Sequence, residues 1–191
     1  LLKLFEKPYE INYDKIIADT YFLSEGTSFS SFKKQLDKRF LLIKNKYKDH
    51  HLLKKYSFDE ILIIGSLLEK EGIDYQDKRK IYSVIMNRLK LNMKLQIDAT
   101  VIFSLTGDKK DFDRKLTYDD LKIQNPYNTY MNFGLPPGPI SYVGHKTIEL
   151  IFEDYKTDYL FYFYNSFENK HIFSLNYRDH LKRLNEYRSK K

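Results

Sequence analysis

One stretch limits what this chain can fold into more than any other. Residues 57–72, with the sequence SFDEILIIGSLLEKEG, begin with Ser57 and place Glu60 three residues later, which is the capping-box pattern of a helix start. The residues that follow are apolar around nearly the whole helix circumference, so we expect a helix that is buried on all sides. Gly72 predicts its end, because a left-handed glycine often terminates a helix.

Two carboxylates lie in the last turn of this predicted helix. Glu69 and Glu71 would stand at the negative end of the helix dipole, where acidic side chains are disfavoured. Positions two residues apart point about 200° away from each other, so at most one of the two can face a given cleft. Glu71 shares its side of the helix with Ile64, Leu67 and Leu68, which makes it the residue on the more apolar side.

Such surroundings would raise the pKa of a carboxyl group, because apolar neighbours and a negative helix end both disfavour the charged form. A raised pKa keeps a glutamic acid protonated near neutral pH, as a general acid has to be. The same pattern also fits two solvated glutamates at the end of a fraying helix. The helix pattern by itself therefore leaves both interpretations open.

The composition is that of a soluble globular protein with a sizeable core. The chain has 191 residues, of which 42% are hydrophobic and 31% charged. It contains no cysteine, which excludes disulfides, thiolate metal sites and cysteine nucleophiles. The net charge of +7 suits an anionic partner such as nucleic acid, a membrane surface or an acidic wall polymer. The basic residues are dispersed, however, which is typical of solubility alone.

Targeting and cofactor signals are absent from the sequence. No apolar run is long enough to cross a bilayer, and no signal peptide is visible. Because the first residue is Leu1 and not Met, we expect a fragment whose N-terminal part is missing. The chain has neither a GxGxxG motif nor a Walker loop, so nucleotide binding lacks support.

The periodicity of the chain predicts an α+β fold, mainly helical, with a small antiparallel β-sheet made of a short strand and a late hairpin. We expect helices at about 27–48, 74–92, 98–105, 146–155 and 177–188, a strand at 93–97, a charged loop at 108–115, and hairpin strands at 159–164 and 171–175. The proline-rich segment 125–140 would be a long ordered loop. Such a loop is either functional or a rigid corner between two lobes.

Five segments occur in an order that is specific to one family. They are SLLEKEG at 66–72, IYSVIMNRLKLNMKLQIDATVIF at 81–103, NPYNTY at 125–130, GLPPGPI at 134–140 and HIFSLNYRDHLKRLNEYR at 171–188. Together they resemble the catalytic domain of the endolytic murein transglycosylases, the YceG-like family. The resemblance implies an N-terminal helical segment at 1–56 and a catalytic domain at 57–191. The chain departs from the family at 141–144, where the family has a proline before the glycine.

The resemblance implies cleavage of peptidoglycan glycan strands between N-acetylmuramic acid and N-acetylglucosamine, without hydrolysis. In that family one glutamic acid protonates the glycosidic oxygen, the sugar's own 6-hydroxyl attacks C1, and the same glutamate takes up the proton. The product is a 1,6-anhydro end, and the family's catalytic glutamate falls on Glu71. Ordinary glycosidases need two carboxylates, but a tethered nucleophile has a large effective concentration, so one carboxylate suffices.

Amide, hydroxyl and tyrosine side chains suit sugar hydroxyls, N-acetyl groups and sugar faces. The candidate substrate contacts are therefore Gln96, Asp98, Tyr127, Asn128, Thr129 and Tyr130. The alternative for Asp98 is helix capping, and for Tyr127 and Tyr130 it is core packing. No cofactor and no metal are expected.

The resemblance also implies a partner set and a location. These are peptidoglycan strands, cell-wall synthesis proteins, and anchoring in the cytoplasmic membrane by a missing N-terminal helix, with the catalytic domain on the outer side. Nucleic acid is not an expected partner. Two other functions stay open: a muramidase with Asp98 as the second carboxylate, and a non-catalytic glycan-binding module.

Overall fold

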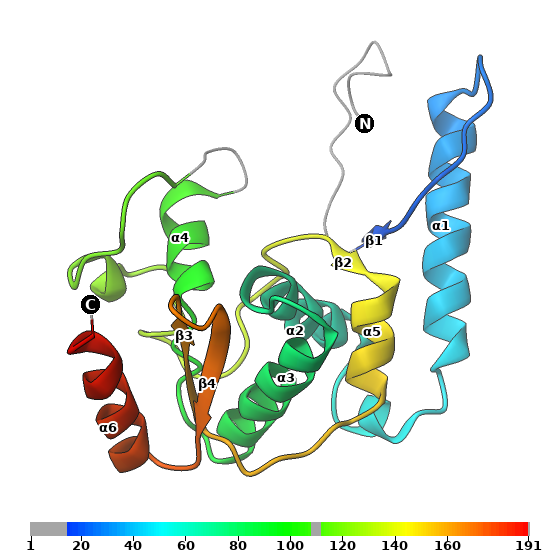
Figure 1. Ribbon diagram of the computed structural model, residues 1–191. Helices are drawn as coiled ribbons and strands as arrows, with labels where there is room; N and C mark the ends of the chain where they lie inside the picture. The colour runs from blue at the N-terminus through cyan, green and yellow to red at the C-terminus, as the bar shows by residue number, and fades with distance from the viewer. Residues whose placement is uncertain (1–14, 108–111, 191) are drawn as a thin grey trace.

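The helix expected at 57–72 lies at the centre of the fold (Figure 1). The structure is a computed structural model that describes residues 15–107 and 112–190. Helix α2 (Phe58–Glu71) begins with the predicted capping box: the Ser57 side chain accepts the Glu60 N–H, and the Glu60 carboxylate accepts the Ser57 N–H at 2.7 Å. Its residues from Ile61 to Leu68 are all buried, as the apolar pattern predicts.

The α+β class expected from the sequence is confirmed. In chain order the elements are β1 (Ile17–Ala18), α1 (Phe29–Lys46), the 3₁₀ turn η3 (His51–Lys54), α2, α3 (Tyr75–Lys90), α4 (Asp98–Thr106), the 3₁₀ turn η4 (Asp120–Lys122), β2 (Val143–Gly144), α5 (His145–Phe152), β3 (Phe161–Asn165), β4 (Lys170–Ser174) and α6 (Tyr177–Arg188). In the described residues no helix is long and apolar enough to span a membrane.

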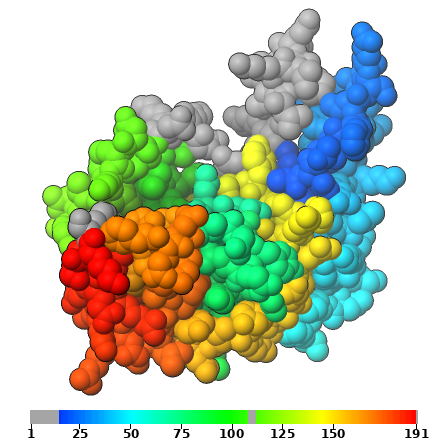
Figure 2. Space-filling view, in the orientation of Figure 1, coloured from blue at the N-terminus to red at the C-terminus, as the bar shows by residue number. Residues whose placement is uncertain are grey.

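Helix α2 is covered by α3, α4, α5 and β2. Gly65 lets β2 approach, because a Cβ atom at this position would lie 2.5 Å from Cγ1 of Val143. Ile17, Ile43 and Leu52, which precede residue 57, belong to the same hydrophobic core as α2. The division of the chain at 56 stays a prediction. Figure 2 shows α1 and the β3–β4–α6 region at opposite edges of one face, with α3 between them.

Replacing Gly65 with Ala should destabilise the protein by about 1–3 kcal/mol, because the added methyl group overpacks the α2–β2 contact. Chemical denaturation measures this change. Since the clash is with Val143, the double variant Gly65→Ala with Val143→Ala should lose less stability than the sum of the two single variants. Simple additivity would show that the methyl group does not meet Val143.

The late hairpin is confirmed. Strands β3 and β4 pair antiparallel, with Tyr162 opposite Phe173 and Tyr164 opposite His171, and α6 packs against both strands. A parallel pair of two-residue strands, β1 with β2, was not expected from the sequence.

Two local expectations are wrong. Residues 93–97 form no strand, because Gln96 has a φ of +51° and its N–H donates to the carbonyl of Thr129. The alternation there reflects an irregular segment that buries Leu95 and Ile97 and leaves Gln96 exposed. Gly72 does follow α2, but its φ is −83° and not left-handed. A Cβ at Gly72 would lie 2.2 Å from Cγ of Lys78, so close packing is what requires glycine. Part of the expected charged loop, residues 108–111, lies outside the described residues.

Candidate active site

Glu71 ends α2, and its carboxyl group meets two hydrogen-bond donors from distant parts of the chain. The hydroxyl of Tyr162, on β3, donates to Oε2 at 2.9 Å. The backbone N–H of Ala99, in the first turn of α4, also donates to this carboxyl group. The end of one helix therefore faces the positive N-terminal end of another.

Burial raises the pKa of the Glu71 carboxyl above its ordinary value, and the nearby Asp98 carboxylate raises it further. The Tyr162 hydrogen bond and His171 lower this pKa, but they do not outweigh burial. The protonated form is thus favoured over a wider pH range than in a solvated glutamate. The surroundings of Glu71 therefore shift its pKa upward, which is the direction that a general acid requires.

Glu69 has the opposite environment, on the other side of the same turn. Its carboxylate forms an ion pair with Lys78 and accepts the N–H of Gly144 at 3.0 Å. Burial disfavours its charge, but hydrogen bonds from Lys78, Thr147 and Gly144 lower its pKa overall. Glu69 is therefore a structural link from α2 to α3 and β2.

Asp98 and Tyr130 are brought together beside Glu71. The Tyr130 hydroxyl donates to Oδ1 of Asp98 at 2.6 Å. The helix-capping alternative for Asp98 is wrong, because Ile97 is the N-cap of α4 and no side chain caps this end. Gln96 is exposed just before these residues, so its amide is free to meet a ligand.

Asn128 and Thr129 lie inside the protein. They are 0% and 1% exposed. The Asn128 amide donates to the carbonyls of Leu121 and Ile123 and accepts the N–H of Tyr130, while the Thr129 hydroxyl accepts the N–H of Ile97. In this structure neither side chain is placed for the direct sugar contact expected from the sequence. Thr129 instead holds the 125–130 loop against the start of α4. Asn128 ties the loop to the segment 121–123 and positions Tyr130 through its backbone N–H.

Tyr127 packs its ring against Phe103, with the ring centroids 4.8 Å apart. It is partly buried and belongs to the edge of the hydrophobic core. The core-packing alternative therefore describes Tyr127 better than it describes Tyr130, whose hydroxyl faces Asp98.

Sequence reasoning missed the residues that support Glu71. Tyr162 is one, and burial raises the pKa of its hydroxyl well above the ordinary value, so it stays a neutral donor. Arg88 is another: it is 7% exposed and donates to the carbonyls of Leu160 and Leu95, each at 2.7 Å. It ties β3 to the segment that leads into α4. An arginine on the apolar side of a predicted helix is the signal that could have indicated this role.

His171 is a third residue that supports the surroundings of Glu71. Its Nδ1 lies 2.8 Å from a carboxylate oxygen of Asp77, and its ring stands edge-on to Tyr162 with centroids 5.4 Å apart. The pair is largely buried, so it fixes the hairpin on α3 and positions Tyr162. Over the described ranges, 15–107 and 112–190, no group of three or more acidic or histidine side chains is arranged to hold a metal ion.

The sequence matches the YceG-like family over residues 13–186. This chain belongs to the YceG-like family. It is 39% identical over 145 residues to the endolytic murein transglycosylase of Bacillus subtilis strain 168, covering 76% of this chain and 39% of that protein. It is 31% identical over 175 residues to the endolytic murein transglycosylase of Streptococcus pneumoniae R6, covering 88% of this chain and 31% of that protein.

A solved YceG-like structure agrees with this fold. The crystal structure of a YceG-like protein from Listeria monocytogenes aligns with a TM-score of 0.74 and 35% sequence identity, over 88% of this chain and 54% of that one. This YceG-like chain thus spans between about a third and two fifths of the length of the two curated relatives named above.

Replacing Glu71 with Gln should change how the stability of this YceG-like chain depends on pH. A glutamate whose pKa is raised in the folded state contributes stability below its unfolded pKa, and this stability is lost as pH rises through the folded pKa. Each unit between the two pKa values corresponds to about 1.4 kcal/mol. We expect denaturation midpoints to coincide near about pH 4 and the variant to be more stable near about pH 8. A less stable variant at the higher pH would contradict the raised pKa.

Proposed function

We propose that this chain is the catalytic domain of an endolytic peptidoglycan lytic transglycosylase, with Glu71 as its only acid–base group. The observation that carries the proposal is the pairing of a buried, protonation-prone Glu71 with donors from Tyr162 and Ala99. The names of the similar proteins from Bacillus subtilis and Streptococcus pneumoniae support the reaction class.

The chemistry follows from this arrangement. Protonated Glu71 donates its proton to the glycosidic oxygen as the bond from that oxygen to C1 of N-acetylmuramic acid breaks. The 6-hydroxyl of the same sugar then attacks C1, and Glu71 takes up the hydroxyl proton, so no water is consumed. Between the two steps Glu71 is a carboxylate, which the Tyr162 hydroxyl and the Ala99 N–H at the start of α4 stabilise.

Asp98, Tyr130 and Gln96 are proposed to contact the substrate. Asp98, held by Tyr130, places a negative charge close enough to Glu71 to act on its pKa. The same charge would stabilise the positive character that develops at C1 in the transition state. The loop at 125–140 supplies Tyr130 and is therefore part of the site, with Asn128 and Thr129 as its internal support.

The proposal is tested by incubating the protein with uncrosslinked glycan strands and measuring their length distribution. Internal cutting gives intermediate lengths early in the reaction, whereas removal of terminal units gives only small products. Retention of the strands at full length, with binding intact, would favour a non-catalytic glycan-binding module instead.

A muramidase is the second candidate, and the proximity of Asp98 to Glu71 favours it. Asp98 would then activate a water molecule, and the product would carry a reducing end.

A location on the outer side of the cytoplasmic membrane and contacts with wall-synthesis proteins belong to the same proposal as the transglycosylase activity, and they rest on the family resemblance.

A further inference from the structure

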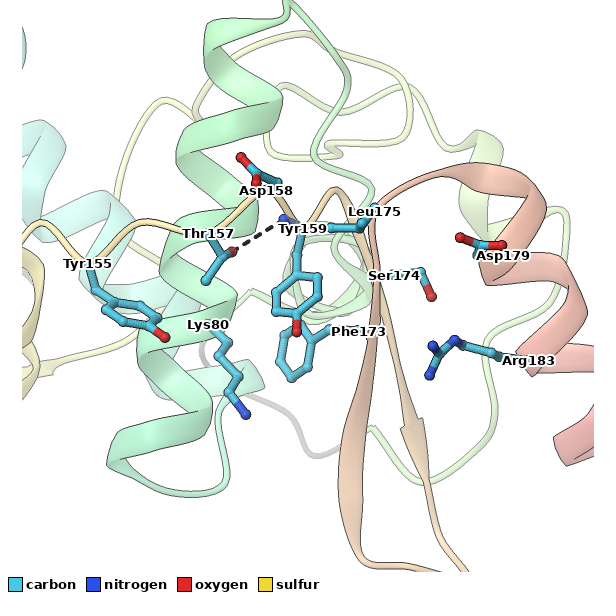
Figure 3. Close-up of a pocket in the computed structure, with 10 residues that line it drawn as sticks. All are labelled: Lys80, Tyr155, Thr157, Asp158, Tyr159, Phe173, Ser174, Leu175, Asp179 and Arg183. Atoms are coloured by element: carbon cyan, nitrogen blue, oxygen red, sulfur yellow. Dashed lines mark hydrogen bonds between the residues drawn. The ribbon is translucent and has the colours of Figure 1, made fainter.

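A pocket lies outside the Glu71 site, between α3, β4, α6 and the segment 155–159 (Figure 3). Its volume is about 540 Å³, which is in the range of pockets that hold small ligands. Lys80, Tyr159 and Phe173 lie on one side of β4, and Ser174 and Arg183 lie on the other.

The pocket presents charges of both signs that form no ion pairs among the described residues, although Asp179 accepts a hydrogen bond from the Asn176 amide at 2.9 Å. Lys80 and Arg183 form no ion pair anywhere in the part of the chain that the structure describes, and Lys80 instead lies over the ring of Phe173 at 5.6 Å. Asp158 and Asp179 line the same pocket. Cations and carboxylates that form no ion pair with one another, gathered around one pocket, suit a ligand that itself carries both charges.

A buried hydroxyl at this pocket also lacks a partner. Ser174 is 2% exposed, and its Oγ has no hydrogen-bond partner. Buried polar groups are nearly always hydrogen-bonded, so this hydroxyl is a donor and acceptor that the described part of the chain leaves unused. On the other side of β4, the rings of Tyr159 and Phe173 lie 5.4 Å apart and offer an apolar surface.

The pocket is connected to the catalytic glutamate through two aromatic rings. The Phe173 ring lies 6.0 Å from the ring of Tyr162, whose hydroxyl donates to Glu71 at 2.9 Å. A four-residue peptide in extended form reaches roughly 13 Å. A peptide attached to a sugar at Glu71 is therefore long enough to reach Phe173.

We propose that this pocket binds the short peptide that branches from N-acetylmuramic acid in peptidoglycan. The peptide carboxylates meet Lys80 and Arg183, its amino group meets Asp158 or Asp179, and its aliphatic parts lie on Phe173. A glycan strand without peptides offers no such set of charges, so the pocket would bind the peptide and not the sugar. This inference rests on the proposed function, since it takes the substrate to be peptidoglycan.

The probe is the free tetrapeptide L-Ala-γ-D-Glu-L-Lys-D-Ala, titrated into the protein and followed by calorimetry. Because a charge-assisted hydrogen bond is lost in each case, Lys80→Ala and Arg183→Ala should each weaken binding about tenfold. The matched control is Arg178→Ala, an exposed arginine of the same helix α6 that does not line the pocket. Glu71→Gln should bind the peptide as the unmodified protein does.

The possible results distinguish a failure of the peptide-binding proposal from a failure of the proposed function. Equal affinity in the unmodified protein, Lys80→Ala and Arg183→Ala would overturn the pocket assignment, as would absence of binding by a protein that still cleaves glycan strands. Selective loss in the two pocket variants supports the assignment. If that loss is seen in a protein that cleaves no strands, the pocket stands and the proposed function fails.

Discussion

Glu71→Gln should abolish detectable cleavage of glycan strands while leaving the fold intact. Glutamine keeps the size of the side chain and can still accept the Tyr162 hydrogen bond, but it cannot donate or take up the catalytic proton. A general acid–base group typically contributes about 10²- to 10⁴-fold in rate, and a group that serves both steps contributes at least as much. The measurement is the initial rate of strand shortening, with far-ultraviolet circular dichroism as the check on folding.

Glu69→Gln is the matched control, two residues away in the same helix turn. It weakens the contacts of α2 with Lys78 and Gly144, so it should lower the denaturation midpoint. Its activity per folded molecule should stay close to that of the unmodified protein. Full activity in Glu71→Gln, or loss only in Glu69→Gln, would refute both the placement of Glu71 and the family assignment of its role.

Tyr162→Phe should lower the cleavage rate by about 10- to 100-fold, because it removes a hydrogen bond to a charged group that forms during the reaction. The same hydrogen bond lowers the pKa of Glu71. Its loss should therefore raise that pKa further, and the fall in activity toward alkaline pH should move to a higher pH. The pH–rate profile measures both effects.

Tyr164→Phe is the control for this change. Tyr164 lies two residues along the same strand, but its hydroxyl donates to Asn169 and not to Glu71. It should leave the rate and the pH profile unchanged. A Tyr162→Phe variant with reduced rate but an unshifted profile would show that Tyr162 supports the hairpin and does not act on Glu71.

The long elements of this fold were predictable because each carries its own local signals. Helix α2 has a capping box at Ser57 and Glu60, and α1, α3 and α6 have apolar periodicity with caps at Ser28, Asp74 and Asn176. Strands β1 and β2 were not predictable, since two residues cannot show a period and their pairing joins Ile17 to Val143. The strand expected at 93–97 is wrong because an irregular segment that buries every second side chain shows the same alternation of apolar residues.

The site was predictable only in part, for a similar reason. The helix-end position of Glu71 and its separation from Glu69 follow from helix geometry alone. Tyr162 is separated from Glu71 by 91 residues, and no local pattern links them. Asn128 carries the polar group that suits a sugar, but its amide is bonded to the carbonyls of Leu121 and Ile123, which only the three-dimensional contacts reveal.

The measurement that tests the central claim most directly is the fate of solvent oxygen during cleavage. The reaction is run in water labelled with heavy oxygen, and the new strand ends are weighed by mass spectrometry. If Glu71 acts alone and the sugar's own 6-hydroxyl attacks C1, the new ends are 1,6-anhydro sugars that are lighter by one water molecule and carry no label. Reducing ends that contain one labelled oxygen would contradict the account and identify a hydrolase in which Asp98 activates water.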